Sequence, residues 1–331
     1  MKISIALCTY NGEKYIAEQI QSLLNQTRLP DEIVISDDGS KDKTLEILYE
    51  FQSKTNVNIR ILEHTENLGV FKNFPFVISA CEGDIIFTCD QDDVWMNTKL
   101  EKHCAVHLSH PDVDLVYSNA DVVLNTPDHY LYPLWEVKSI LDTLNGKASY
   151  TSLVIKGQSI AGCCMSFKKD FFERILPIPE KIFHDDWIAT SACLTSKIIG
   201  LSESLIKYRQ HSNNVVGIIR GRKLSYYKSL FTNVPFYVKS DEYIAKRHHI
   251  VYEAMQVHPF LKQYLIDRNI NEIIELYDSR INYATQGFTQ SFNKLTLSLT
   301  KGYYRHLNGI FTYIKDLYNL MFITLFIKKI D

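Results

Sequence analysis

The sequence has almost no net charge. Its 36 Lys and Arg residues stand against 38 Asp and Glu residues, which leaves a formal charge of -2 over 331 residues. A chain this close to neutrality has no overall field that would draw it to nucleic acid, and it carries no acidic solvating tail. The charge balance therefore argues against a polynucleotide-binding function.

Paired cysteine motifs are also missing. The seven cysteines include no CxxC spacing, and most of them lie inside apolar runs such as IALCTY and IIFTCD. The adjacent Cys163 and Cys164 do not have the spacing of a redox centre or of a zinc site. We expect buried free thiols in a protein of a reducing cytoplasm.

No apolar run is long enough to span a membrane. The first residues, MKISIALCTYNGE, alternate like a core strand and become polar too early for a secretory signal. The longest apolar run has 11 residues, Leu317 to Ile327, whereas a helix needs roughly 20 to cross a bilayer. With 46% hydrophobic residues, the chain is expected to be globular, with one or two domains.

Strand-like and helix-like segments alternate through the first 90 residues. The expected strands and helices are strands 3–8, 32–36, 57–63 and 84–89, and helices 15–24, 42–53 and 70–81. This alternation predicts an α/β fold with a mostly parallel sheet covered by helices on both faces. From about residue 217 the sequence changes to basic and aromatic segments at helical spacing. We therefore predict an α/β domain over residues 1–216 and a helical C-terminal region over residues 217–331.

Polar clusters follow three of the predicted strands. They are Thr9-Tyr10-Asn11, Asp37-Asp38-Gly39-Ser40 and Asp90-Gln91-Asp92-Asp93. Open α/β sheets bind ligands beyond the carboxyl ends of their strands. The chemistry of this protein should therefore be sought in these three clusters.

The third cluster places three carboxylates at one strand end. Repulsion among Asp90, Asp92 and Asp93 is costly unless a cation neutralises them, and such oxygen ligands suit Mg²⁺ or Mn²⁺. An acidic turn that caps the next helix produces the same pattern and is, on spacing alone, the commoner explanation. An Asx turn similarly explains Gly39 and Ser40, but not the two preceding carboxylates.

Four sequence blocks together point to a known family. CTYNGEKYIAEQIQSLLNQT, EIVISDDGSKDKT, NLGVFKNF and FTCDQDDVWMNTKL follow one another in an order and spacing that resembles the family 2 glycosyltransferases of the Rossmann-like GT-A fold. The resemblance continues through AGCCMSF, HDDWIA and YRQHSNNVVG to about residue 217. These blocks look like the branch labelled rhamnosyltransferase, which takes part in bacterial polysaccharide and O-antigen assembly.

The resemblance implies roles for individual residues. The residues that it assigns to the donor nucleotide are Thr9, Tyr10, Asn11, Asp37, Asp38, Asp90 and Asp92. Within this set, Thr9, Tyr10 and Asp38 would line the base pocket, while Asp90 and Asp92 would meet the ribose and the metal-bound diphosphate. Mn²⁺ or Mg²⁺ would be held by Asp92 or Asp93, together with His211.

The block His184-Asp185-Asp186-Trp187 stands where the family carries its catalytic base. The resemblance assigns this role to Asp185, with Asp186 as the alternative. A sugar hydroxyl is a poor nucleophile at neutral pH, and a nearby carboxylate can take its proton as the new bond forms. One base with in-line displacement inverts the anomeric centre, and a divalent cation stabilises the leaving diphosphate. The same residues also fit the start of a helix, where acidic side chains are favourable. A base at a helix start is compatible with both interpretations.

Three further residues near these motifs have alternative explanations. Trp95 and Trp187 each follow an acidic motif closely, and such a ring can hold a sugar or anchor a loop to the core. We expect core packing for Trp95 and leave both interpretations open for Trp187. Gly162 is expected to let the backbone approach a substrate.

The resemblance as a whole predicts an inverting glycosyltransferase of cell-surface polysaccharide synthesis. The donor would be dTDP-rhamnose or a UDP-hexose, and the acceptor a glycan or a lipid-linked oligosaccharide. A nucleotidyltransferase is the first alternative, but it usually has a glycine-rich phosphate loop after the first strand, which CTYNGEKYI is not. A catalytically inactive protein that binds nucleotide sugars is the second alternative.

The last thirty residues suggest a membrane contact. Residues 301–331 interleave basic residues with aromatic and aliphatic ones, which fits a helix lying in the membrane interface. Packing of this helix on the rest of the protein fits equally well. The implied biology favours a peripheral position at the inner face of the cytoplasmic membrane.

Overall fold

The computed structural model describes residues 1–134, 160–211, 250, 251, 253–265 and 293. The chain divides into two compact units, one of residues 1–149 with 159–217 and one of residues 150–158 with 218–331. In the second unit, α11 (Lys262–Leu265) is described. The predicted domain boundary and the predicted helical region after it fall largely outside the described residues, so both stay predictions.

A single sheet organises the first unit. Its strands are β1 (Ile3–Thr9), β2 (Glu32–Asp37), β3 (Asn58–Glu63), β4 (Ile85–Cys89), β5 (Val94–Trp95), β6 (Val113–Leu124), β7 (Tyr130–Pro133), β8 (Met165–Lys168) and β9 (Lys197–Gln210). Its helices are α1 (Ile16–Leu24), α2 (Thr44–Lys54), α3 (Val70–Ala80), α4 (Lys99–Ser109), α7 (Lys169–Arg174), α8 (His184–Thr195) and the short η1 (Gly162–Cys164). The predicted strands and helices of the first 90 residues are all present, with small shifts at their ends.

The strand order is β3-β2-β1-β4-β8-β6-β9-β5, with β7 paired to β6. The first four strands are parallel, as the alternating pattern predicts. β8 then runs antiparallel to both of its neighbours, β4 and β6, while β6 and β9 are parallel. The α/β class is confirmed, and the second half of the sheet is mixed.

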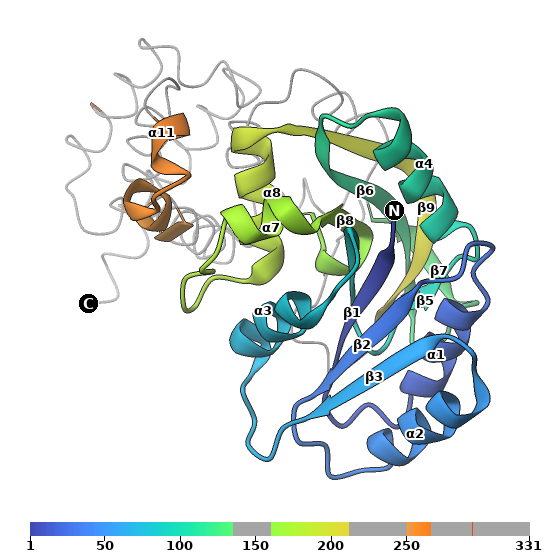
Figure 1. Cartoon of the computed structure of the whole chain (residues 1–331). Helices are drawn as coiled ribbons and strands as arrows, with labels where there is room; N and C mark the ends of the chain where they lie inside the picture. The colour runs from blue at the N-terminus through green and yellow to red at the C-terminus, as the bar shows by residue number, and fades with distance from the viewer. Residues whose placement is uncertain (135–159, 212–249, 252, 266–292, 294–331) are drawn as a thin grey trace, which may run out of the picture. The chain divides into compact units, whose positions relative to one another are not determined.

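Helices cover both faces of the parallel strands (Figure 1). The chain moves outward from β1 through β2 to β3, which places α1 and α2 on one face, where they contact each other. It then returns past β1 to form β4, and right-handed crossovers put α3 on the opposite face. β2 and β4 flank β1, so the direction in which strands are added to the sheet reverses at β1. α/β sheets bind ligands at such a switch point.

Both tryptophans near the acidic motifs belong to the core. Trp187 is fully buried, and its Nε1 donates to the carbonyl oxygen of Ile175 at 2.8 Å. Trp95 is also buried, as expected. Core packing therefore holds for both residues, and neither ring is exposed to a sugar.

The cysteines are free thiols, as the sequence predicts. All seven lie within the described residues and none is in a disulfide. Six are buried and Cys8 is half-buried. Burial raises the pKa of Cys81 to about 12, so its reactive thiolate form is suppressed at neutral pH.

No helix in the described part of the chain is long and apolar enough to cross a membrane. The apolar run from 317 to 327 and the basic and aromatic residues from 301 to 331 lie outside the described residues. The interfacial helix therefore stays a prediction.

A buried histidine pair joins α4 to β8. His103 and His107 are four residues apart on one face of α4, and both rings bond the hydroxyl of Ser166, at 2.9 and 3.0 Å. Burial lowers the pKa of His107 to about 4 and holds the pKa of His103 well below its ordinary value. Both rings are therefore neutral in the folded protein at neutral pH.

We expect the free energy of unfolding to fall as the pH drops from about 6.5 to about 4. Over this range the unfolded chain binds a proton at His107 that the folded protein does not, so acid favours unfolding. Because the pKa of His107 is lowered to about 4, this one residue is expected to reduce the free energy of unfolding by roughly 3 kcal/mol at pH 4. Urea denaturation at pH 7, 5.5 and 4 measures the loss. His107→Gln should lose less stability over the same range, and an equal loss would contradict the assignment.

Candidate active site

The carboxyl ends of β1, β2 and β4 bring the three predicted clusters together. Thr9 lies opposite Asp37 in the register of β1 and β2, and its hydroxyl donates to Asp37 Oδ2 at 2.8 Å. The Ser40 hydroxyl donates to the same oxygen at 2.6 Å, and the Ser40 N–H donates to Oδ1 at 2.8 Å. Both Thr9 and Asp37 are buried. They shape the turn at the base of the predicted donor site.

Asp38 holds the loop that precedes α3. Its two carboxylate oxygens accept the backbone N–H groups of Leu68 at 2.6 Å and Gly69 at 2.9 Å. The side chain of Asn67 donates to its carbonyl oxygen at 3.2 Å. Gly69 has φ +75°, a backbone conformation that favours glycine. These bonds explain why the block NLGVFKNF accompanies the Asp-Asp turn.

Tyr10 is the exposed aromatic residue of the donor cluster. Its side chain is 47% exposed, whereas Thr9 beside it is buried. Asn11 next to it has φ +48°, and its Oδ1 accepts the N–H of Lys41 at 2.8 Å. The backbone around Tyr10 is thus tied to the turn after β2, while the ring faces outward.

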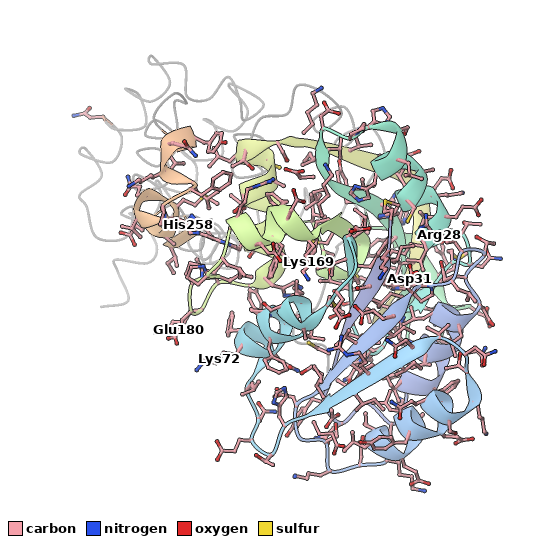
Figure 2. The ribbon with its side chains drawn as sticks, in the orientation of Figure 1. Arg28, Asp31, Lys72, Lys169, Glu180 and His258 are labelled. Carbon is pink, nitrogen blue, oxygen red and sulfur yellow. The ribbon has the colours of Figure 1, made fainter. Side chains whose placement is uncertain are left out.

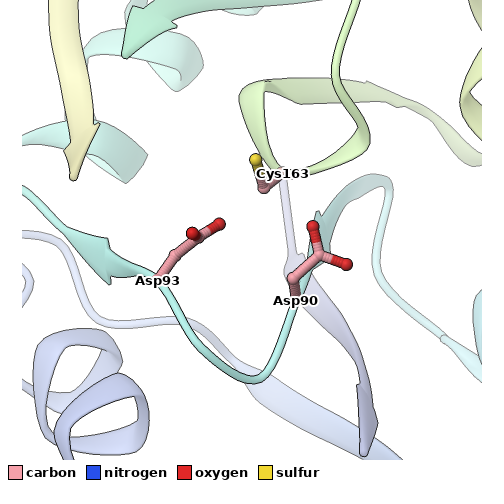
Figure 3. Close-up of side chains that lie close together, drawn as sticks. All are labelled: Asp90, Asp93 and Cys163. Carbon is pink, nitrogen blue, oxygen red and sulfur yellow. The ribbon is translucent and has the colours of Figure 1, made fainter. Parts of the chain in front are cut away.

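Asp90, Asp93 and Cys163 lie close together at the end of β4 (Figure 3), and of the three Asp93 and Cys163 are buried while Asp90 is half-buried. One ligand atom from each lies within 4.8 Å of the others. Oδ2 of Asp93 is buried and accepts no hydrogen bond. The nearby Cys163 thiol nevertheless lowers the pKa of the Asp93 carboxyl. Burial, followed by the charge of Asp92, nonetheless raises the pKa of Asp93 to about 7. Burial and the neighbouring carboxylates raise the pKa of Asp90 well above its usual range.

A buried lysine lies beside this group. Lys99, the first residue of α4, has no exposed surface, donates to the carbonyl of Cys163 and lies 3.4 Å from the centroid of the Trp95 ring. Burial lowers its pKa to about 8. Its charge lowers the pKa of both Asp90 and Asp93. Sequence reasoning missed Lys99 because a lysine at a helix start ordinarily faces solvent.

Asp92 points to another partner. Its Oδ2 lies 2.8 Å from Nε2 of His211, whose ring stacks on Tyr15 with centroids 4.6 Å apart. Of the residues predicted to hold the metal, the structure thus pairs Asp92 with His211 and places Asp93 with Asp90 and Cys163. The carboxylate oxygens at this polar strand end suit Mg²⁺ or Mn²⁺, while the imidazole nitrogen of His211 is a ligand for a transition metal such as Mn²⁺ rather than for Mg²⁺.

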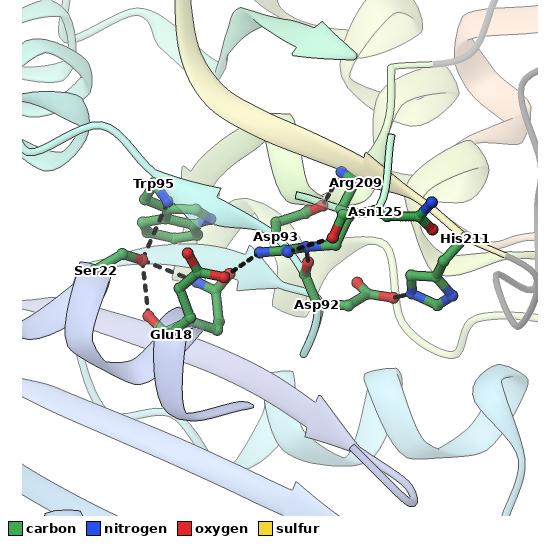
Figure 4. A network of polar contacts seen from close by, with 9 residues as sticks. Glu18, Ser22, Asp92, Asp93, Trp95, Asn125, Arg209 and His211 are labelled. Carbon is green, nitrogen blue, oxygen red and sulfur yellow. Dashed lines mark hydrogen bonds and ion pairs between the residues drawn. The ribbon is translucent and has the colours of Figure 1, made fainter. Parts of the chain in front are cut away.

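Arg209 joins the acidic loop to the end of β9 (Figure 4). Its backbone N–H donates to Asp93 Oδ1 at 3.0 Å, and its Nε donates to the carbonyl of Asp92 at 2.7 Å. Nη1 donates to the carbonyl of Asn125 at 2.7 Å, and Nη2 pairs with Glu18. Sequence reasoning missed this residue, since only its place in the block YRQHSNN sets it apart from other arginines.

Arg209→Met is expected to lower the free energy of unfolding by about 3 kcal/mol, because it removes all the bonds of a buried guanidinium, two to backbone carbonyls and one to a carboxylate. Lys207→Met on the same strand is the matched control. Lys207 pairs with Asp121 at 2.7 Å, but 27% of its side chain is exposed, so its loss should cost less than about 1 kcal/mol. Urea denaturation compares the two, and equal costs would contradict the role of Arg209.

The candidate bases lie in the first turn of α8. Asp185 is half-buried, and its Oδ1 accepts the N–H of Asp186 at 2.8 Å, whereas Asp186 is buried. The charge of Asp185 contributes to the raised pKa of Asp90. A Cβ built at Gly162 would lie 3.6 Å from the Cβ of Asp185, and the next residue, Cys163, belongs to the group with Asp90 and Asp93.

Gly162 and α3 define the surroundings of Asp185. A side chain at 162 would meet Nε2 of His184 at 2.8 Å, so the space where we expected a substrate to approach is taken by His184. The His184 ring stacks on Phe74 of α3, with centroids 3.8 Å apart. Lys72 of the same helix lies 4.0 Å from Glu180 in the loop before α8 (Figure 2). The buried contact between His184 and Phe74 packs the start of α8 against α3, whereas the pair of Lys72 and Glu180 is exposed and contributes little.

Comparison with known proteins identifies the family. The model of glycosyl transferase family 2 matches residues 4–176. The chain belongs to this family. The dTDP-rhamnosyl transferase RfbG of Shigella flexneri is 31% identical over 228 residues, which are 64% of this chain and 73% of the relative. An uncharacterised glycosyltransferase of Nostoc is 27% identical over 218 residues, or 65% and 66% of the two chains. The chain spans 60% of the length of an uncharacterised Mycobacterium tuberculosis relative.

Solved structures of Staphylococcus aureus TarS share the fold of this family 2 member. TarS 1–349 in complex with UDP-GlcNAc aligns with a TM-score of 0.58 and 17% identity, covering 99% of this chain and 92% of TarS 1–349. At this identity the similarity concerns the fold alone. The predicted GT-A type of fold is confirmed, and membership of this family favours a glycosyltransferase over a nucleotidyltransferase.

Proposed function

We propose that this family 2 glycosyltransferase is an inverting, divalent-cation-dependent enzyme of bacterial cell-surface polysaccharide synthesis. It transfers a sugar from a nucleoside diphosphate to a glycan or lipid-linked acceptor. One observation carries the proposal: two separate carboxylate groups converge beyond the strand ends. The first is the acidic loop after β4, and the second is Asp185 of α8, which lies beside Gly162, the residue before Cys163 of the acidic group.

The donor occupies the ends of β1, β2 and β4 in this proposal. The exposed ring of Tyr10 provides a face for the base, on a floor shaped by Thr9, Asn11, Asp37 and Asp38 through the bonds described above. Asp90 meets the ribose. Asp92 and His211, whose ligand atoms are 2.8 Å apart, hold the cation, with Asp93 as the other candidate. The cation, when bound, stabilises charge on the leaving diphosphate.

Asp185 serves as the base for the acceptor hydroxyl. The hydrogen bond from the Asp186 N–H orients Oδ1, and Oδ2 takes the proton as the hydroxyl oxygen attacks the anomeric carbon. The other candidate, Asp186, is buried. Inversion follows because one displacement occurs without a covalent sugar intermediate.

The donor sugar is either L-rhamnose, carried by dTDP, or a hexose or N-acetylhexosamine, carried by UDP. The name of the Shigella relative supports the first, and the UDP-GlcNAc complex of TarS is compatible with the second. A lipid-linked acceptor would place the enzyme at the inner face of the cytoplasmic membrane, where the basic and aromatic segment over 301–331 would contact lipid.

A donor screen tests the proposal. Purified protein is incubated with a bacterial lipid-linked glycan fraction as acceptor, with dTDP-rhamnose, UDP-glucose or UDP-GlcNAc, and with Mn²⁺ or Mg²⁺. Release of the nucleoside diphosphate is measured with and without a chelator. We expect one donor to be turned over and the chelator to abolish release. Release that persists in the chelator would remove the cation from the mechanism, and release from none of the donors would contradict the transferase assignment for these sugars.

A further inference from the structure

Gln91 joins the acidic loop to the backbone of Tyr10. The Tyr10 N–H donates to Gln91 Oε1 at 2.9 Å, and Gln91 Nε2 donates to the Tyr10 carbonyl at 3.1 Å. The pairing of β1 with β4 ends at Leu7 and Cys89. The side-chain amide, which has one acceptor and two donor hydrogens, therefore continues the pairing beyond the end of the strands, as a peptide group would.

Gly12 provides the space for this side chain. A Cβ built at Gly12 would lie 2.3 Å from Oε1 and 2.8 Å from Cδ of Gln91, which real contacts do not allow. The backbone of Gly12 is itself fixed, because its N–H donates to the Thr44 hydroxyl at 2.8 Å and its carbonyl accepts the N–H of Ile16 at 3.0 Å. The glycine is therefore needed at this position to admit Gln91.

A second set of bonds holds the same turn from the side of β2. The Asn11 N–H donates to the Ser40 hydroxyl at 2.8 Å, and Asn11 Oδ1 accepts the N–H of Lys41 at 2.8 Å. Tyr10 is thus held between the ends of β4 and β2, while its ring is 47% exposed. An exposed ring on a rigid backbone can stack on a planar ligand without losing backbone entropy on binding.

We propose that Gln91 is a positioning residue that fixes Tyr10 as the platform for the donor base, and that it thereby sets nucleotide affinity more than the rate of transfer. The inference rests on the proposed function, because it assumes that the base stacks on Tyr10. Gln91 lies between Asp90 and Asp92 in the sequence. Its side chain therefore connects the part of the site that recognises the base with the part that binds the diphosphate.

Gln91→Met tests the inference, because methionine has a similar length but neither donates nor accepts as the amide does. Calorimetric titration with UDP and dTDP in the presence of Mn²⁺ should show a Kd raised roughly five- to tenfold, as expected for two hydrogen bonds near the surface. With the donor found in the screen, KM should rise by a similar factor while kcat changes less than about twofold. A fall in kcat at constant Kd would overturn the proposal.

A double-mutant cycle separates this role from a general effect on the acidic loop. In a Tyr10→Ala background, Gln91→Met should raise Kd less than about twofold, because the ring that it positions is gone. Independent, multiplying effects would mean that Gln91 acts through Asp90 or Asp92, and would overturn the proposal. If the wild-type protein binds neither nucleotide, the proposed function fails. If the wild-type protein and the Gln91→Met variant bind the nucleotide with the same Kd, only the role of Gln91 is contradicted.

The steric relation with Gly12 supplies a second, independent variant. Gly12→Ala should raise the nucleotide Kd several-fold in the wild-type background, because it displaces the Gln91 side chain. In a Gln91→Ala background the same substitution should leave Kd unchanged, since the shorter side chain no longer reaches position 12. Thermal unfolding of all four proteins controls for folding. An equal effect of Gly12→Ala on Kd in both backgrounds would contradict the inference.

Discussion

Asp185→Asn is expected to lower kcat by about a thousandfold, within the range for loss of a general base, and to leave the Kd of the nucleotide nearly unchanged. The amide keeps the size of the side chain and can still accept the N–H of Asp186, as Oδ1 does now, but it cannot take a proton from the acceptor. Single-turnover measurements with the donor found in the screen, together with nucleotide titration, separate the two effects.

The neighbouring aspartate is the matched control. Asp186 is buried while Asp185 is half-buried, so Asp186→Asn is expected to act mainly on stability and to lower kcat less than about tenfold. If Asp186→Asn gives the thousandfold loss and Asp185→Asn does not, the base is Asp186. If transfer persists in both variants, neither carboxylate is the base.

Asp92→Asn is expected to lower kcat/KM by about a hundredfold and to raise the Mn²⁺ concentration needed for half-maximal activity. A neutral amide is a weaker ligand for a hard divalent cation than a carboxylate. His211→Gln should act in the same direction, because Asp92 Oδ2 and His211 Nε2 lie 2.8 Å apart and would share the ion. Manganese titration of activity measures both shifts.

Two controls make the metal assignment specific. Asp121→Asn alters an aspartate of β6 that pairs with Lys207, and its Mn²⁺ dependence should match the wild type. The double variant of Asp92 and His211 should be little worse than either single one, since ligands of one ion act as a unit. If Asp93→Asn shifts the Mn²⁺ dependence and Asp92→Asn does not, the ion is bound in the group with Asp90 and Cys163.

Much of the first unit follows from local patterns in the sequence. Strands buried on both faces are nearly continuous in apolar residues, as in ISIALC and EIVIS, and the polar residues after them mark where each strand stops. Because parallel strands end at one edge, these patterns also place Thr9, Asp38 and Asp90 near one another. The order of the family blocks adds the activity class, which no single motif carries.

Neighbouring residues in these clusters nevertheless separate in space. Asp92 turns to His211 while Asp93 turns to the end of β9 and Cys163, because consecutive side chains in a tight turn point in different directions. The letters DQDD do not encode these directions. They depend on which distant segments pack against the loop.

The sequence by itself therefore determines the layered α/β architecture of the first unit, the ends of its strands and the family, since these depend on short-range periodicity and on the order of motifs. Tertiary structure alone decides the roles of three residues that sequence reasoning passed over. Lys99 is buried against Cys163, Arg209 bonds the carbonyl of Asp92 across 117 residues of chain, and Gln91 bonds Tyr10 across 81. The reason is physical: the burial and the partners of a polar side chain depend on segments brought together only by folding.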